Sequence, residues 1–222
     1  MDQKGNTYEF KLASGSPRRK ELIEVAGWHT LLHPVMIEEK SRPEEDPVSL
    51  VKRLALEKAE KASDEDGMIV LGADTIVVLG KRILGKPLDG RHAAVMLEEL
   101  YGKVHQVITA IALVDCANDH FLVDFCVTNV PMRKYSPSEV EAYIATSSPL
   151  DKAGAYGIQD GDFHPVDIDR MKGCFANVMG LPLCHLTRAL KGFNIASREN
   201  VPQNCMEHTQ YNCQVYKDIL QL

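Results

Sequence analysis

The spacing of hydrophobic residues along the chain predicts a series of amphipathic helices. Between residues 47 and 62 the apolar side chains fall near one helical face. The preceding Asp46 suits a helix cap, and Pro47 suits the first helical position. The same spacing predicts further helices over residues 89–101, 136–145 and 182–193.

Continuous apolar runs between these helices predict buried strands. The run at residues 68–71 suits a strand that is covered on both faces. Residues 72–75, Gly-Ala-Asp-Thr, interrupt it before the run resumes at 76–79, so we expect a break between two strand segments. Further strands are predicted over residues 82–84, 104–114, 121–135 and 175–179. Strands that alternate with helices indicate an α/β fold.

Residues 12–22 join a strand end to a helix start and carry an unusual charge pattern. Ser16 suits the N-cap of this helix, and Pro17 suits its first position. Arg18 and Arg19 then fall in the first turn, where the helix dipole is already positive, so they cost stability unless an anion is bound. The arrangement suits a phosphate chain, and a solvated pair of arginines is the alternative. We expect that loss of Arg19 does not destabilise the ligand-free protein.

The charge balance limits the classes of partner that the chain can serve. Its 222 residues carry 25 Lys and Arg against 31 Asp and Glu, a net charge of -6. A general nucleic-acid binder usually carries a basic face, so no nucleic-acid partner is expected. A small basic cluster can still attract a phosphorylated small molecule. No apolar stretch approaches the roughly 18 residues of a membrane span, so no membrane partner is expected.

The lack of a membrane span and the N-terminal sequence predict a cytoplasmic protein. Residues 1–6 lack the apolar core of a signal peptide. None of the six cysteines forms a C-x-x-C pair, and without a secretion signal they are expected to be reduced thiols. Cys205, His208 and Cys213 lie close together in the sequence, but a zinc site there lacks an evident fourth ligand.

Several polar residues outside the first helix are candidates for chemistry. Asp74 follows a buried apolar run, and open α/β sheets bind ligands at the carboxyl ends of strands. A carboxylate there can hold a divalent cation or accept a proton from water, whereas the alternative is a turn-forming Asp. Glu39 lies in the acidic loop at residues 36–46, where a solvated charge run is the alternative. Lys86 could contact a phosphate and Gln159 a base edge or ribose, and an exposed side chain is the alternative for both.

An ordered series of motifs extends through most of the chain. They lie at residues 12–22, 72–78, 85–87, 100–107, 151–159 and 180–183. In these motifs the chain resembles the Maf family of nucleoside triphosphate pyrophosphatases, in the family order and over about residues 10–193. We therefore expect a Maf-like domain over residues 1–196 and a C-terminal tail of undetermined structure over 197–222.

The resemblance implies a fold, a reaction and a cofactor. The fold would be an elongated mixed sheet with flanking helices, in two lobes around a nucleotide-binding cleft. The reaction would hydrolyse a nucleoside triphosphate to the monophosphate and pyrophosphate, a housecleaning role in the nucleotide pool, with Mg²⁺ or Mn²⁺ as the divalent metal. A homodimer is a further hypothesis for the assembly of the chain.

The resemblance also assigns roles to single residues. The matched functional positions are Ser14, Arg18, Arg19, Glu39, Lys58, Asp74, Lys86 and Gln159. Glu39 and Asp74 would hold the metal, and Asp74 would help to deprotonate the attacking water. Arg19, Lys58 and Lys86 would neutralise charge on the pyrophosphate leaving group. The serine and the helix N-terminus would orient the phosphates.

Substrate choice follows from three of these family positions. One branch, which resembles dTTP/UTP pyrophosphatases, carries Arg, Thr and Gln where this chain has Arg18, Thr75 and Gln159. Another branch prefers 7-methyl-GTP and carries different residues, so that substrate or a broad specificity is the alternative. The chain departs from the family after Gln159, where residues 160–167 replace the usual glycine-rich continuation.

Two other classes of function remain open at this level. A nucleotide-binding regulator that does not turn over would keep the basic residues but could dispense with Glu39 and Asp74, whose presence argues against it. A phosphatase that removes one phosphate at a time would use similar residues. The products separate these hypotheses: none, orthophosphate, or pyrophosphate with a monophosphate.

Overall fold

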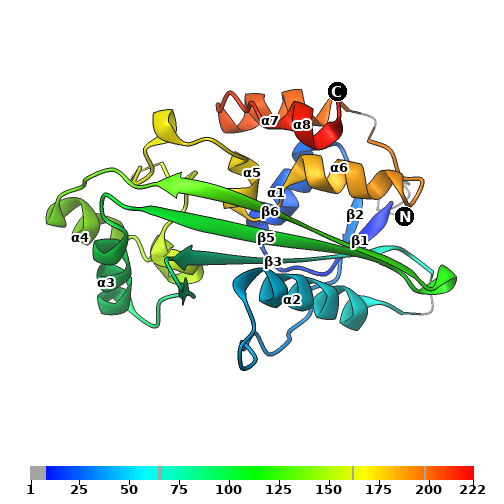
Figure 1. The fold of residues 1–222 in the computed structure, drawn as a ribbon, viewed down its shortest axis with the longest axis horizontal. Helices are drawn as coiled ribbons and strands as arrows, with labels where there is room; N and C mark the ends of the chain where they lie inside the picture. Colours follow the sequence, from blue (N-terminus) through cyan, green and yellow to red (C-terminus); the bar gives the residue numbers. More distant parts are fainter. Residues whose placement is uncertain (1–8, 65–66, 162, 198) are drawn as a thin grey trace.

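A long mixed β-sheet with helices on both faces forms the frame of the protein (Figure 1). The computed structural model describes residues 9–64, 67–161, 163–197 and 199–222. The strands are β1 (Phe10–Leu12), β2 (Thr30–Leu32), β3 (Val70–Leu79), β4 (Arg82–Leu84), β5 (Val104–Asp115) and β6 (His120–Pro131). They lie in the order β2-β1-β3-β5-β6, with β4 paired to β3. Because β1 is parallel to its neighbours and β5 antiparallel to its own, the predicted mixed sheet with flanking helices is confirmed.

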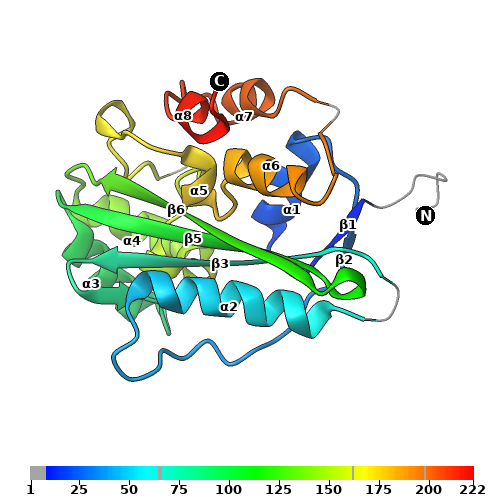
Figure 2. The same cartoon turned by 45° about the vertical axis from the view of Figure 1, so that its right-hand side comes forward.

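The helices form layers on the two faces of this sheet. They are α1 (Pro17–Val25), α2 (Pro47–Ala62), α3 (Gly90–Leu100), α4 (Pro137–Ala145), α5 (Phe175–Met179), α6 (Leu183–Lys191), α7 (Val201–Thr209) and α8 (Tyr216–Leu220). Short 3-10 turns lie at Cys116–Asn118, Ser148–Asp151, Ala153–Ala155 and Ile168–Arg170. In Figure 2, α2 runs along one face while α5 and α6 lie on the other. The predicted first helix and the helices predicted over 47–62, 89–101, 136–145 and 182–193 are confirmed as α1, α2, α3, α4 and α6.

The predicted break at residues 72–75 is wrong, because β3 runs through it without interruption. The strand pairs with β5 from Val70 to Val78. A Cβ atom built on Gly72 would lie 2.1 Å from the carbonyl oxygen of Ala55 and 2.7 Å from the backbone nitrogen of Ala59, both on α2. The glycine therefore permits close packing of helix on strand and does not mark a turn.

The strand predicted at residues 175–179 is also wrong, because these residues form helix α5. At its start Cys174 Sγ accepts a hydrogen bond from the Asn177 N–H, and at its end Gly180 adopts a φ of 113°. The Asn177 side chain is fully buried and donates to the Val107 carbonyl at 3.0 Å. That partner lies on β5, so local sequence spacing could not reveal the helix.

Two smaller differences concern strand ends. β6 ends at Pro131, short of the predicted residue 135, and the Arg133 N–H instead donates to the Pro165 carbonyl of a later loop. β2, which was not predicted, is a three-residue edge strand that pairs with β1.

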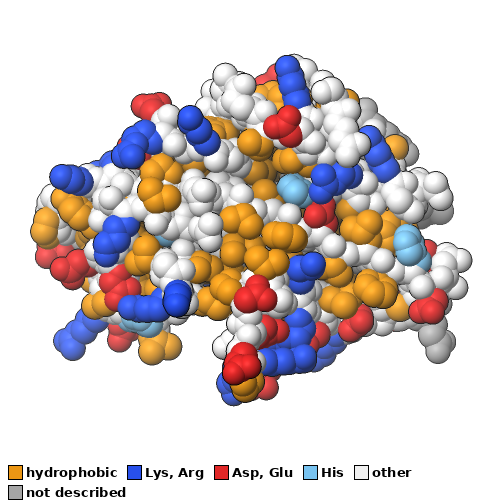
Figure 3. Space-filling view, in the orientation of Figure 1, with side chains coloured by type: hydrophobic (Ala, Val, Ile, Leu, Met, Phe, Trp, Pro, Cys, Tyr) orange, Lys and Arg blue, Asp and Glu red, His pale blue; other side chains and the backbone are white. Residues whose placement is uncertain are grey.

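Hydrophobic side chains form one core on each face of the sheet. On one face Ala55 and Ala59 of α2 pack with Ile76 of β3. On the other face a larger core includes Leu22 of α1 and Leu97 of α3. Figure 3 shows hydrophobic side chains gathered across the middle of one surface of the molecule. No helix among the described residues is long and apolar enough to cross a membrane.

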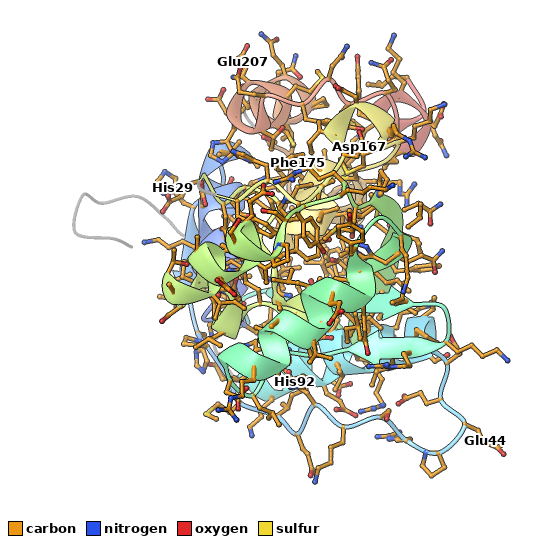
Figure 4. All side chains as sticks on the ribbon, turned by 90° about the vertical axis from the view of Figure 1, so that its left-hand side faces the viewer. His29, Glu44, His92, Asp167, Phe175 and Glu207 are labelled. Atoms are coloured by element: carbon orange, nitrogen blue, oxygen red, sulfur yellow. The ribbon has the colours of Figure 1, made fainter. Side chains whose placement is uncertain are left out.

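The C-terminal residues pack against the back of α1. Asn204 Nδ2 donates to the Val25 carbonyl at 3.2 Å, and Ser197 Oγ donates to the Ala26 carbonyl at 2.8 Å. These bonds satisfy orphan carbonyls at the helix end. Figure 4 places Glu207 of α7 on the opposite side of the molecule from Glu44, which lies in the loop before α2. The boundary between residues 196 and 197 stays a prediction.

The zinc alternative near the C-terminus is not supported. No group of three or more His, Cys, Asp or Glu side chains in the described part of the chain is arranged to hold a metal. His208 Nε2 instead lies 3.0 Å from Glu21 Oε1 on α1. The prediction of no signal peptide rests on residues 1–6, which lie outside the described residues. Asp162 of the divergent loop also lies outside them.

Candidate functional site

A cleft opens where β3 lacks a neighbouring strand on one edge. β1 pairs with β3 only at Val70 and Leu71, and β4 pairs with it only from Val77 onward. Between these pairings, within the described residues, no strand covers residues 72–76 on that side. The chain leaves β1 here through a loop into α1, and a cleft of about 360 Å³ lies over the uncovered edge.

The wall of this cleft contains every residue that the sequence predicted for the site. They are Ser14, Arg18, Arg19, Glu39, Lys58, Asp74, Thr75, Lys86 and Gln159. These residues come from α1 and the loop before it, from the loop before α2, from α2 and β3, and from two later loops. The fold therefore brings together side chains that lie far apart in the sequence.

Asp74 and Thr75 point to opposite faces of β3, because side chains alternate along a strand. Asp74 faces α2, where Lys58 Nζ donates to its Oδ1 at 2.6 Å. The same Nζ donates to Glu39 Oε1, also at 2.6 Å. Asp74 is 5% exposed and Lys58 is 7% exposed, whereas Glu39 is exposed at the cleft mouth. One buried ammonium thus links the two carboxylates that were predicted to hold a metal.

The charges around Glu39 keep it ionised. Burial acts to raise the pKa of this carboxyl, but the hydrogen bond and charge of Lys58 outweigh it, with Lys86 and Arg19 adding to their effect. The net result is a pKa below the ordinary value for Glu. Glu39 is therefore negatively charged throughout the neutral range.

Arg19 lies on the Thr75 side of the strand and is held by three hydrogen bonds. Its Nε donates to the Gly180 carbonyl at 2.9 Å, its Nη1 to Ser14 Oγ at 3.2 Å, and its Nη2 to Thr75 Oγ1 at 3.0 Å. Burial lowers the pKa of this guanidinium, the charge of Asp74 opposes that shift, and the charge of Arg18 adds to it. Arg19 is thus both a cation in the cleft and a link between α1, β3 and the end of α5.

The hydrogen bonds of Arg19 in the fold argue against the expectation that its loss leaves ligand-free stability unchanged. We predict that Arg19→Ala destabilises the ligand-free protein by about 1–3 kcal/mol, because the buried Gly180 carbonyl loses its charged donor. Urea unfolding of both proteins without nucleotide measures this difference. Arg91→Ala, at an exposed position on α3, is the matched control. An unchanged unfolding midpoint in Arg19→Ala would contradict the structural role.

The start of α1 leaves backbone donors for an anion. Ser16 is the N-cap residue as predicted, but its side chain makes no capping hydrogen bond. Its own N–H donates to Ser14 Oγ at 3.2 Å instead. Arg18 points toward Asp151, with Nη1 3.2 Å from Oδ2. Helix N-termini of this kind bind phosphate groups through free N–H groups and the helix dipole.

Comparison with known proteins identifies the family. A family model described as Maf-like protein matches residues 9–193. The chain belongs to the Maf family. A dTTP/UTP pyrophosphatase of Citrifermentans bemidjiense is 44% identical over 181 residues, covering 81% of this chain and 93% of that protein. A dTTP/UTP pyrophosphatase of Escherichia coli is 44% identical over 187 residues, covering 82% and 92%.

A solved structure is also similar to this Maf-family chain. It is a HAM1 protein from Coxiella burnetii, with a TM-score of 0.42 and 20% sequence identity. The match covers 58% of this chain and 75% of that one.

The cleft of this Maf-family chain also contains residues that the sequence did not single out. Lys152 and Tyr156 lie in its wall, within the matched motif at residues 151–159. The Tyr156 hydroxyl lies 2.7 Å from Nε2 of His105, a side chain that is 1% exposed. Burial lowers the pKa of His105 to about 4, so its imidazole is neutral at physiological pH. The motif at residues 151–159 pointed to this region, but roles within it could be assigned only from contacts such as that between Tyr156 and His105.

Proposed function

We propose that this Maf-family chain is a nucleoside triphosphate pyrophosphatase that hydrolyses dTTP and UTP to the monophosphate and pyrophosphate. One observation carries the proposal: Lys58 holds the carboxylates of Glu39 and Asp74 together, at 2.6 Å from each, in a cleft that also contains several cationic side chains. The names of the curated relatives support the same activity. A role in clearing nucleotides from the cellular pool follows from that reaction.

The donor set in the cleft fits a divalent metal such as Mg²⁺ or Mn²⁺. Glu39 and Asp74 supply two carboxylates on one side of the cleft, and no larger cluster of ligating side chains occurs among the described residues. Mg²⁺ is commonly held by one or two carboxylates together with substrate phosphates and water. When bound, the metal would polarise the phosphate oxygens and favour ionisation of a nearby water.

The side chains of the cleft divide the chemical work among them. Lys58 donates to one oxygen of Asp74, so the carboxylate is held in one orientation and can accept a proton from the attacking water. Lys86 is exposed in the cleft wall, where its ammonium can meet the charge that develops on the leaving pyrophosphate. Arg19 is already fixed by its hydrogen bonds, so it stabilises that charge with little further ordering.

Recognition of the base is assigned to Gln159, Arg18 and Thr75, which all line the cleft. Gln159 is exposed in the cleft wall, and its amide can both donate to and accept from a pyrimidine edge. Arg18 lies on the wall formed by α1. The Thr75 hydroxyl accepts from Arg19 and lies 3.0 Å from Thr109 Oγ1, so it shapes the pocket through those residues. A 7-methyl-GTP preference or a broad specificity is the alternative substrate assignment.

Product analysis across a nucleotide panel tests the proposed function. We expect dTTP and UTP to give pyrophosphate and monophosphate, with a higher kcat/KM than CTP, GTP or 7-methyl-GTP. Gln159→Ala should lower the preference for dTTP over GTP by about tenfold, because an unpaired polar group in the pocket costs on the order of 1–3 kcal/mol. Orthophosphate as the first product, or no product, would contradict the proposal. A wild-type optimum on 7-methyl-GTP would transfer base reading to residues 160–167.

A cytoplasmic location is part of the proposal. All six cysteines are free, as expected in a reducing compartment. A homodimer is also part of the proposal, and light scattering of the purified protein tests it.

A further inference from the structure

Lys152 lies in the cleft wall, yet its ammonium has no hydrogen left for a ligand. Its side chain is 8% exposed. Nζ donates to the Ser148 carbonyl at 2.6 Å, to Ser148 Oγ at 2.7 Å and to Asp151 Oδ1 at 3.0 Å. An ammonium carries three N–H donors, so these contacts use all of them. Lys152 can bind a phosphate only by giving up one of these bonds.

One branch of this network leads from Lys152 to Arg18. Asp151 receives Lys152 on Oδ1 and Arg18 Nη1 on Oδ2, the latter at 3.2 Å. Burial acts to raise the pKa of Asp151, but the Lys152 hydrogen bond and the Arg18 charge outweigh it, so its pKa lies below the usual value and it stays ionised. Because the Asp151 carboxylate is 60% exposed, the Arg18–Asp151 pair contributes little to stability, and its main effect is on the orientation of the guanidinium.

A second branch leads from Lys152 to the loop of Gln159. Asp160 Oδ2 lies 3.4 Å from Lys152 Nζ. The same oxygen accepts from the Tyr143 hydroxyl at 2.5 Å and from Ser148 Oγ at 2.9 Å. Asp160 directly follows Gln159, so these bonds fix the backbone from which Gln159 extends into the cleft.

We propose that Lys152 is a positioning residue for substrate selectivity: through Asp151 and Asp160 it fixes the relative positions of Arg18 and Gln159. This inference rests on the proposed function, in which those two residues read the base. When Arg18 and Gln159 are held at a fixed distance, they favour the smaller pyrimidine and exclude a purine. If they could move apart, they would accept both. The alternative role for Lys152, direct binding of phosphate, is an outcome that the test distinguishes.

The test compares Lys152→Met with wild type, since methionine keeps the length of the stem and removes the donors. We expect KM for dTTP to rise about tenfold while kcat changes less than about threefold, because displaced reading groups weaken binding more than chemistry. The ratio of kcat/KM for dTTP over dGTP should fall by a similar factor. Lys152→Arg should restore most of this ratio. Lys103→Met, at an exposed position outside the cleft, is the matched control and should behave as wild type.

Combination with Gln159→Ala shows whether Lys152 acts through the reading residues. We expect the double variant to lose less selectivity than the sum of the two single losses, because effects within one network are not additive. Additive losses of selectivity would overturn the proposal. So would an equal fall in kcat on every nucleotide, which would assign Lys152 to phosphate binding.

Equilibrium binding separates this inference from the proposed function. Calorimetric Kd values for dTMP and dGMP report base discrimination without turnover, and Lys152→Met should bring the two values closer together. If wild type releases no pyrophosphate, the proposed function fails while these Kd values still test Lys152. Should Lys152→Met not fold, Asp151→Asn breaks the first branch at a solvated site and should lower the dTMP preference. An unchanged preference in Asp151→Asn would then overturn the inference.

Discussion

Asp74→Asn should lower kcat for dTTP hydrolysis by about two orders of magnitude or more, the usual scale for a group that moves a proton in catalysis. The amide is nearly isosteric with the carboxylate but cannot accept a proton from water at neutral pH. Lys58 keeps Glu39 as a partner in the variant, so folding is retained. The measurement is pyrophosphate release under saturating nucleotide, together with a thermal unfolding curve.

A matched control separates this effect from a general loss of charge. Asp169→Asn changes an exposed aspartate outside the cleft and should leave kcat unchanged. Activity of Asp74→Asn within about threefold of wild type, far below the scale of acid-base catalysis, would remove Asp74 from the mechanism.

Lys58→Met should lower kcat by about a hundredfold, the scale seen when one preorganised electrostatic contact is removed. The variant loses the only side chain seen to bond both Glu39 and Asp74 in the described residues, so the carboxylates repel each other and their geometry is lost. Lys52→Met on the same helix, where the ammonium lies over the Phe125 ring, is the control.

The pH profile of Lys58→Met gives a second and independent readout. In wild type, burial acts to raise the pKa of Glu39, but the hydrogen bond and charge of Lys58 outweigh it, so the pKa lies below its ordinary value. Lys58 is the strongest influence that lowers the pKa of Glu39 against the effect of burial. Without it, the pKa of Glu39 should rise. The acid limb of the rate profile should therefore move to higher pH. An unmoved limb would show that Glu39 ionisation does not control activity.

Local signals in the sequence were enough to predict helices whose N-caps are formed by neighbouring residues. The Asp46 side chain accepts from the Val48 and Ser49 N–H groups at the start of α2, and Ser136 with Glu139 forms a capping box at the start of α4. These contacts span a few residues, so their spacing is visible in the chain. The candidate site residues of the cleft were also predictable from the family resemblance, whereas Lys152 and Tyr156 in the same wall were not singled out.

Features that depend on distant contacts were not predictable in the same way. In the sequence, Gly72 looks like the end of a strand. In the structure, glycine is needed there because the backbone of α2 lies too close to β3 for a Cβ atom. The sequence shows no hydrogen-bond partner for Arg19, because its partners Gly180 and Thr75 come close only in the folded protein. The roles of single cleft residues stay predictions until the variants above are measured.

The alternation of Asp74 and Thr75 along β3 has a practical consequence for engineering. Because the two side chains leave the strand on opposite faces, a variant library that randomises Thr75 alters one wall of the cleft and leaves the Lys58–Asp74 pair in place. Thr75 lies within a strand that pairs with β5 on both sides of this position, and Arg19 keeps its bonds to Gly180 and Ser14 when the threonine hydroxyl is lost. New nucleotide preferences should therefore be selectable from such a library while the carboxylate that accepts the proton is kept in place.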